Sequence, residues 1–398
     1  MKVLSVGYYD DFARFFLEIE KELKKHDKNL EFKYLSLYFS GFLYCIFKFR
    51  HSSFFSFIAR ARAIINRKYY KSIVKNNSHY KGINLDKVIQ YHVLLRGSDL
   101  TSLKIQAISY IDLIDRILID FTPDALILSG DSRMSIEIFK KIATGAGINV
   151  YYFEQGPFGT TIFDKNGVNA NASIRDCAFN IESCEYENKR SEVEYFLNKK
   201  SAIKYKQNPV FRGSDYIIQI LFSIVNLYPL DIKMNLNRMN ISKDYTQLNS
   251  IVKKNKKVYL LIMQVPYDVN MIYHSPFYNN HYDIVKNVFK SLPKNTQLIV
   301  REHPLYKSKY EKSLYSFMNE HQISIDKTSL HSSMMNANVV IVNNSTVGVE
   351  AISKFKPVIV LGNSYYDNEN ICLKLKEKDQ LESLLEQSLD WHVNKLAV

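Results

Sequence analysis

The chain has 398 residues, of which 46% are hydrophobic, and a formal net charge of +13. This length exceeds what one ordinary core supports, so two domains are expected, and only 13 Gly and 9 Pro exclude a fibrous or disordered chain. The positive charge calls for an anionic partner, such as a lipid headgroup, an acidic polysaccharide or nucleic acid. Nucleic acid is expected least, because no known nucleic-acid-binding module is recognisable.

The first half of the chain alternates strands and helices. Residues 1–7 read as a strand without the order of a signal peptide, so a cytoplasmic protein is expected. Residues 124–128 and 147–153 are further predicted strands with a helix over 135–144 between them. These elements predict one α/β domain, followed by a charged helical connector over residues 185–255.

Two apolar segments of the first half bear on membrane contact. Residues 34–67 combine aromatic and basic side chains, which suits either a peripheral helix on an anionic membrane or a core helix with a solvated basic edge, and the two alternatives weigh evenly. Residues 216–228 are the strongest apolar run. They are too short to cross a bilayer, so a buried helix is predicted there.

Two carboxylates follow the predicted strands of this first domain. Asp131 comes after the strand over 124–128 and Glu154 after the next one, so both are expected at one sheet edge, facing a crevice. Asp131 has an equally weighted alternative as the N-cap of the following helix. Arg133 is a candidate for holding phosphate or carboxylate charge.

The second half begins with a predicted strand over residues 257–263. A later predicted strand over 298–301 ends at Arg301 and is followed by Glu302, His303 and Pro304, and the proline forbids its continuation. An imidazole at this edge can bind a ribose or donate to a departing phosphate oxygen. Alone, a His-Pro after a strand is more often an ordinary loop.

A third buried strand, over residues 339–342, precedes Asn343, Asn344, Ser345 and Thr346. These residues supply helix N-cap chemistry at the carboxyl end of the strand, where a phosphate fits. The alternative is that Ser345 or Thr346 only caps its helix. The conjunction with His303 in one Rossmann-like half favours the ligand site.

These motifs together resemble the capsule polysaccharide biosynthesis family, which includes the retaining β-Kdo glycosyltransferases of bacterial capsule export systems. Four blocks within residues 120–370 carry the resemblance: residues 153–156 with 167–171; Gln264, Val265 and Asp268 with 274–277; His303 and Pro304; and 344–348 with 356–358 and 365–367.

The resemblance implies an α/β, GT-B-like fold of two Rossmann-like domains facing a central crevice. We expect an acceptor-side domain over 1–250, a nucleotide-sugar domain over 251–375 and a C-terminal helix over 376–398. The implied reaction transfers Kdo from CMP-Kdo to a lipid or polysaccharide acceptor, with retention of configuration. The expected partners are therefore a CMP-activated sugar donor, that acceptor, the anionic inner-membrane surface and the capsule export machinery, without nucleic acid.

The resemblance and the edge positions assign roles to individual residues. Glu154 is the favoured essential group, Asp131 the candidate nucleophile, and His303 a catalytic and phosphate-binding residue. Arg301 and Lys356 join Arg133 as charge-holding residues. No metal or cofactor is expected, since no DxD triplet is present. The residues expected to bind the nucleotide sugar are Gln264, His303, Pro304, Asn344, Ser345, Thr346, Gly348 and Glu350.

The first block departs from the family pattern. Kdo-transferring members show two adjacent acids where this chain has Glu154 and Gln155, and Pro157 and Phe158 follow the glycine. Two alternatives therefore stay open. One is a sialic-acid or other nucleotide-sugar transferase for surface glycan, and the other is a non-catalytic capsule assembly or export protein that binds anionic glycan.

Overall fold

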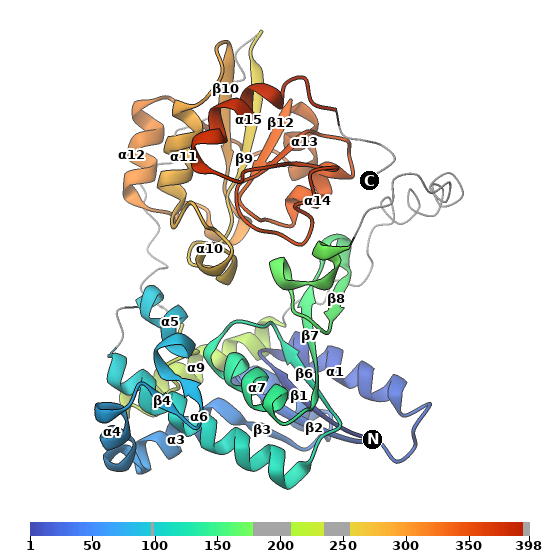
Figure 1. Cartoon of the computed structure of the whole chain (residues 1–398), viewed down its shortest axis with the longest axis vertical. Coiled ribbons are helices and arrows are strands. Elements are labelled where there is room, and N and C mark those ends of the chain that lie inside the picture. The colour runs from blue at the N-terminus through green and yellow to red at the C-terminus, as the bar shows by residue number, and fades with distance from the viewer. Residues whose placement is uncertain (97–98, 178–207, 235–254, 393–398) are drawn as a thin grey trace. The chain divides into compact units, whose positions relative to one another are not determined.

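The computed structural model describes residues 1–96, 99–177, 208–234 and 255–392, and these form two compact units (Figure 1). The described part of the first unit comprises residues 1–96, 99–154, 161–168 and 208–234. The second comprises 155–160, 169–177 and 255–392. Each unit is a Rossmann-like α/β domain built on a six-stranded sheet.

The sheet of the first unit has the strand order β3-β2-β1-β6-β7-β8. Within this sheet, neighbouring strands from β3 through β2, β1 and β6 to β7 pair in parallel, and the interior strand β1 is buried, as its apolar composition requires. The order of the strands along the chain reverses between β1 and β6, and ligands bind at the carboxyl ends of such a switch point. The strands are β1 Lys2–Gly7, β2 Glu31–Ser36, β3 Ser52–Phe54, β6 Ala125–Ser129, β7 Asn149–Gln155 and β8 Thr161–Asp164.

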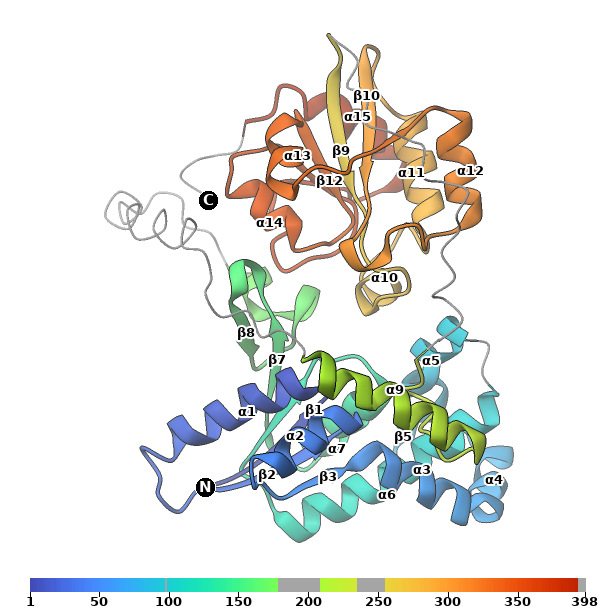
Figure 2. The same cartoon turned by 180° about the vertical axis from the view of Figure 1, so that it is seen from behind.

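Helices cover this sheet, as Figures 1 and 2 show. The sequence predicts the helix before β7 and the strands on both sides of it to within about two residues, because their apolar periodicity is strong. The helices are α1 Asp10–Leu23, α2 Phe39–Phe47, α3 Phe55–Ile65, α4 Arg67–Asn76, α5 Leu85–Arg96, α6 Leu100–Phe121, α7 Met134–Gly145 and α9 Pro209–Ile224; a small hairpin joins β4 His79–Tyr80 to β5 Ile83–Asn84.

Helix α9 corrects one prediction. The apolar run over 216–228 is helical up to Ile224, but it is not a buried helix: the side chains of Ile217 and Ile224 are 59% and 75% exposed. The buried residues of α9 are the polar Asp215 and Gln219. They anchor the helix by hydrogen bonds, and Ile218 and Phe222 pack beside them against the core, while a second set of apolar residues faces outward.

The segment over residues 34–67 contributes both to the core and to the surface of the first unit, and its membrane alternative stays a prediction. Phe54 and Phe55 are buried and belong to the core of the first unit. Arg60 is also buried, where it donates to the carbonyl oxygen of Asn226. The end of α2 differs, because Phe47 is 65% exposed.

The sheet of the second unit repeats the same topology, in the order β11-β10-β9-β12-β13-β14, with all neighbours parallel. Its switch point lies between β9 and β12. The side chains of β12 are fully buried, as the run of valines and isoleucine predicts. The strands are β9 Lys257–Ile262, β10 Thr296–Arg301, β11 Ser324–Ile325, β12 Val339–Val342, β13 Val358–Val360 and β14 Leu373–Lys374.

Of the C-terminal helix expected over 376–398, the described residues show only α15, Leu381–Gln387, whose Leu381 and Leu385 pack into the core of the second unit. The expected domain boundary at residue 250 lies outside the described residues. Within the described part of the chain, no helix combines the length and apolarity needed to cross a bilayer. The helices of this unit are α10 Val269–Tyr273, α11 His281–Lys290, α12 Lys312–Glu320, α13 Leu330–Asn336, α14 Val347–Ile352 and α15 Leu381–Gln387, with short 3-10 turns at Pro304–Tyr306 and Lys378–Gln380.

Candidate functional site

Two buried amides flank the switch point of the second unit. Gln264 follows β9 and Asn344 follows β12, and their side chains are 6% and 7% exposed. Asn344 donates to the carbonyl oxygens of Asn270 and His274, at 2.9 and 3.0 Å. The Oε1 of Gln264 and the Oδ1 of Asn344 accept no hydrogen bond from the described residues. Buried amide oxygens in this state suit the hydroxyl or amino groups of a ligand.

His303 lies at the end of β10, the strand next to β9. Its Nδ1 accepts from the backbone N–H of Leu305 at 3.3 Å, a pattern that assigns the proton of the neutral ring to Nε2. Burial lowers the pKa of His303, and the Asp268 carboxylate opposes that shift only in part. The imidazole is therefore neutral at pH 7 and offers an Nε2–H donor rather than a cation.

A tyrosine that the sequence did not single out joins these two strand ends. The Tyr310 hydroxyl donates to the carbonyl oxygen of Gln264 at 3.1 Å and accepts from the backbone N–H of His303 at 3.0 Å. Burial raises the pKa of Tyr310, so the hydroxyl keeps its proton. One tyrosine among 28 carries no local signal of this role.

The turn after β12 makes local contacts. The hydroxyl of Ser345 accepts from the backbone N–H of Val347 at 3.3 Å, a local contact made from the position before the N-cap of α14. Thr346 occupies the N-cap position of α14 without a side-chain cap bond. At Gly348, a Cβ atom would overlap the ring of Tyr366, whose hydroxyl donates to the carbonyl oxygen of Ser345. The structure thus gives Gly348 a packing role beneath Tyr366.

Glu350 lies inside α14 rather than at the strand end, and its charge adds to burial in raising the pKa of Tyr365. Pro304 opens a short 3-10 turn directly after His303. Its ring fixes the backbone at the point where β10 stops. A direct ligand role for either residue stays a prediction.

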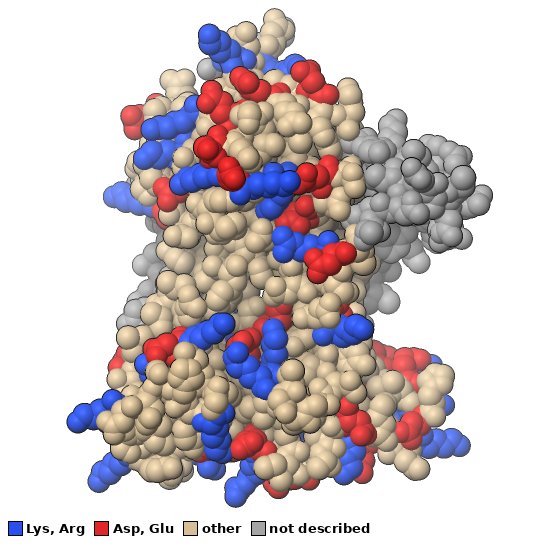
Figure 3. Space-filling view, in the orientation of Figure 1, with Lys and Arg blue, Asp and Glu red and all other residues tan. Residues whose placement is uncertain are grey.

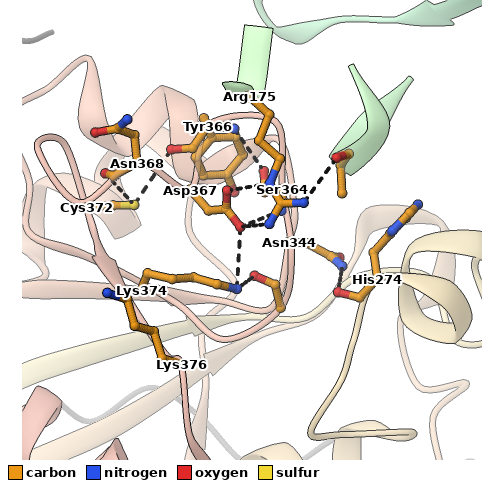
Figure 4. A network of polar contacts seen from close by, with 12 residues as sticks. Arg175, His274, Asn344, Ser364, Tyr366, Asp367, Asn368, Cys372, Lys374 and Lys376 are labelled. Atoms are coloured by element: carbon orange, nitrogen blue, oxygen red, sulfur yellow. Dashed lines mark hydrogen bonds and ion pairs between the residues drawn. The ribbon is translucent and has the colours of Figure 1, made fainter. Parts of the chain in front are cut away.

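Figure 4 shows an ion-pair network near Asn344, which belongs to the turn after β12. Arg175 binds Asp367 through two hydrogen bonds, of 2.9 and 3.1 Å, and Lys374 lies 3.5 Å from the same carboxylate. The Asp367 side chain is 5% exposed and also accepts from the backbone N–H of Ser364. Since its charge is compensated from two sides, Asp367 can be buried here. The network fastens residues 169–177 to the second unit.

Two predicted charge-holding residues have other partners. Arg301 donates to Asp326 at 3.2 Å, to the carbonyl oxygen of Thr328 at 2.7 Å and to Ser333. Lys356 donates to the last carbonyl oxygens of α13 and its flank, at Met335 and Ala337. Because Lys356 precedes β13, it lies at the amino edge of a parallel sheet, opposite to Gln264 and Asn344. The structure does not bring it to the predicted site.

Glu154 and Tyr8 come together at the switch point of the first unit. A Cβ atom on Gly130 would lie 3.9 Å from the Tyr8 hydroxyl and 4.0 Å from a carboxylate oxygen of Glu154. Gly130 has φ +74°, which a larger residue would adopt only with strain. Burial raises the pKa of Tyr8, and the charge of Glu154 adds to this effect. The site therefore pairs a half-buried carboxylate with a neutral phenol.

Asp131 is 3% exposed. One of its oxygens accepts from the backbone N–H of Val168 at 3.0 Å, and the other from the hydroxyl of Ser132. The N-cap position of α7 belongs to Arg133, so Asp131 does not take the capping role that the sequence left open. Its contacts tie residues 161–168 to the end of β6, and a nucleophilic role stays a prediction.

Arg133 lies among tyrosines. Its guanidinium carbon is 4.7 Å from the ring centre of Tyr8 and 5.8 Å from that of Tyr91. The described residues provide it with no carboxylate at ion-pair distance. Arg212, by contrast, stacks on Tyr9 at 3.7 Å and pairs with Asp215. A half-buried cation held by neutral rings can accept an anionic group from a ligand.

Charges of both signs are interspersed on the face drawn in Figure 3. The described residues of that face form no continuous basic stripe of the kind that follows a nucleic-acid backbone.

Comparison with known proteins gives local and global similarities. The chain is 32% identical over 127 residues to protein FixF of Sinorhizobium fredii, covering 31% of this chain and 30% of that protein. It is 28% identical over 123 residues to the capsule polysaccharide export protein KpsS of Escherichia coli, covering 28% and 31%. The matched part thus spans less than a third of each of these relatives.

Among solved structures, the β-Kdo 2,7 transferase of KpsC from Thermosulfurimonas dismutans superposes with a TM-score of 0.39 at 15% identity, covering 72% of this chain and 86% of that one. UDP-GlcNAc 2-epimerase from Neisseria meningitidis gives 0.37 at 16% identity, covering 98% and 92%. The family model of capsule polysaccharide biosynthesis proteins matches residues 124–383. This chain therefore belongs to the capsule polysaccharide biosynthesis protein family.

Proposed function

We propose that the protein is a glycosyltransferase of surface polysaccharide biosynthesis that takes a sugar, Kdo in the first instance, from a CMP-activated donor to a lipid or glycan acceptor. The observation that carries this proposal is the switch point of the second unit. There Gln264, His303 and Asn344 stand at the carboxyl ends of three neighbouring strands. Family membership and the motif resemblance support the direction of the proposal.

On the side of the nucleotide sugar, the proposed chemistry uses neutral His303 as a hydrogen-bond donor. Its Nε2–H hydrogen-bonds a phosphate oxygen of the nucleotide and offsets negative charge as the bond from the anomeric carbon to CMP breaks. Gln264 and Asn344 accept from hydroxyl or amino groups of the nucleoside. No step of this scheme requires a metal ion.

On the acceptor side, Glu154 is the proposed essential group and Arg133 the proposed anion holder. In a retaining reaction, a carboxylate attacks the anomeric carbon, CMP departs, and the acceptor hydroxyl then displaces the enzyme while a base takes its proton. We assign attack to Asp131 and proton removal to Glu154. Arg133 would then pair with the carboxylate of the transferred sugar or with a charged group of the acceptor.

The same proposal places the protein in the cytoplasm, at the inner membrane, beside the capsule export machinery. Its support is the name of the E. coli relative, a capsule polysaccharide export protein, together with family membership. Because the match spans less than a third of that relative, the export role remains part of the proposal.

The test is a calorimetric titration of the purified protein with CMP, UDP and GDP. We expect selective CMP binding, reduced at least about tenfold in His303→Ala, since a charge-assisted hydrogen bond contributes about 1.5–3 kcal/mol. His331→Ala on α13 is the matched control, because that histidine is exposed. Preference for UDP or GDP would overturn the CMP donor and favour another nucleotide sugar. No nucleotide binding would favour a non-catalytic assembly role.

A further inference from the structure

We propose that the outer face of α9 and the end of α2 together form a surface that binds an anionic lipid bilayer. This surface, called here the α9–α2 surface, consists of exposed apolar side chains and the basic residues beside them. The apolar members are Ile46, Phe47 and Phe49 at the end of α2, and Val210, Ile217, Ile220, Leu221, Ile224 and Val225 on and just after α9.

Helix α9 has apolar residues on two sides: Ile218 and Phe222 pack against the core of the first unit, and a second set faces outward. Ile217, Ile220, Leu221 and Ile224 follow one another at spacings of three, one and three, which places them on one face, and they are between 52% and 75% exposed. An aliphatic stripe of this extent in water costs free energy, so its exposure points to an apolar partner.

The inward face of α9 makes polar contacts in addition to the packing of Ile218 and Phe222. Asp215 accepts from the backbone N–H of Ser40 at 2.7 Å and pairs with Arg212. The amide of Gln219 exchanges two hydrogen bonds with the backbone of Met234, at 2.6 and 2.7 Å. These directional bonds fix which side of the helix faces the unit. The outward position of the aliphatic stripe therefore follows from the anchoring and not from loose packing.

The end of α2 shows a second unusual feature. Phe49 is 94% exposed and has φ +54°, a left-handed conformation that helix ends usually reserve for Gly. The Phe49 ring is not buried in the unit, so burial does not offset this strain. An aromatic side chain held outward in this way is suited to insertion at the apolar side of a headgroup layer.

The two features are neighbours on one surface. Phe211, in the first turn of α9, contacts Tyr44 and Phe47 of α2, with ring centres 5.5 and 6.0 Å apart. Figure 2 shows α9 running alongside α2 on the same side of the first unit.

Charge selects an anionic bilayer as the occupant. Three exposed basic residues lie beside the exposed phenylalanines at the end of α2. Lys48 lies between Phe47 and Phe49, and Arg50 and His51 follow them. Arg50 contacts Glu20 through Nε at 2.8 Å. The one acidic residue of α9 is the buried Asp215. A second copy of the chain would bring two cationic ends together, whereas anionic headgroups compensate them and lipid tails cover the stripe.

The experiment is flotation of the full chain with vesicles of phosphatidylcholine alone or mixed with anionic phosphatidylglycerol. Wild type should float with the anionic vesicles and less so at high salt. Ile217→Ser combined with Ile224→Ser, and separately Phe47→Ser combined with Phe49→Ser, should reduce the bound fraction by about tenfold. Ile119→Ser on α6 is the matched control, since Ile119 is 69% exposed on another helix of the same unit.

Three results would overturn the proposal: absence of vesicle binding by wild type, equal binding by the α9 variants, or a dimer by light scattering that those variants abolish. CMP titration of the same variants separates this surface from the proposed reaction. Unchanged CMP binding with lost flotation supports the membrane surface whatever the donor is. If wild type floats with the vesicles but does not bind CMP selectively, only the proposal of a CMP-activated sugar donor is refuted.

Discussion

At the level of single residues, Glu154 is the side chain on which the proposed reaction depends most. It lies beside the Tyr8 hydroxyl, above a glycine that leaves the space open. Glu154→Gln should lower CMP release from CMP-Kdo by at least about 100-fold, because the amide removes the base and keeps the shape. Glu137→Gln on α7, where the carboxylate pairs with Lys141, is the control. Unchanged turnover in Glu154→Gln would refute the assignment.

Tyr310 is a positioning residue in the proposed site, since its hydroxyl touches Gln264 and His303 and fixes the distance between two strand ends. Tyr310→Phe should weaken CMP binding about five- to tenfold and lower the free energy of unfolding by about 1–2 kcal/mol. The control is Tyr282→Phe, a change at a half-buried tyrosine on α11. If stability falls while CMP affinity is unchanged, the hydroxyl has a structural role only.

At the level of elements, helix α11 begins with a histidine that makes the second unit sensitive to acid. Burial lowers the pKa of His281 to about 3, and its Nε2 accepts from the backbone N–H of Gln264. The unfolded chain binds a proton near pH 6.5 and the folded one does not, so stability is retained above that pH and lost as pH falls.

Between pH 7 and pH 5 this difference should cost about 2 kcal/mol of unfolding free energy. His281→Gln keeps an acceptor and should flatten the dependence, measured by urea unfolding at both pH values. His303, whose pKa is also lowered, adds in the same direction and remains in the variant. An equally steep decline in His281→Gln would assign the acid sensitivity to other groups.

Helix α14 depends on the absence of a side chain at Gly348, because the Tyr366 ring fills that space. Gly348→Ala should therefore displace Tyr366 and destabilise the second unit by about 1–3 kcal/mol. Adding Tyr366→Ala to Gly348→Ala should restore room at the turn, so the double variant should show less than the sum of the two single effects. Strict additivity, measured by urea unfolding, would contradict the proposed overlap.

The elements themselves could be predicted well wherever apolar runs are buried on both faces, as in β6, β9, β10 and β12. Parallel pairing then brings Gln264, His303 and Asn344 to one edge without further information. The directions of Arg301 and Lys356 could not be predicted, since a long side chain reaches several partners from one backbone position. The outward face of α9 was missed because apolar residues lie on both sides of the helix, so the run reads as that of a buried helix.

At the level of the whole molecule, the sequence did not reveal that residues 155–160 and 169–177 join the second unit. The contact that fastens the latter segment links Arg175 with Asp367, which are 192 positions apart. An ion pair over such a separation gives no local signal. The predicted division into 1–250 and 251–375 follows the order of the chain, whereas the second unit also includes residues 155–160 and 169–177 from the first part of the chain.

The contribution of residues 169–177 to the second unit limits how the protein can be recombined. Joining residues 1–250 of this chain to the remainder of another family member would take Arg175 and Asp367 from different parents. An unmatched partner at either position would leave a buried carboxylate or a cation without compensation. The two halves are thus coupled by one bidentate salt bridge, and a recombinant that takes residues 169–177 and the C-terminal half from the same parent avoids the mismatch.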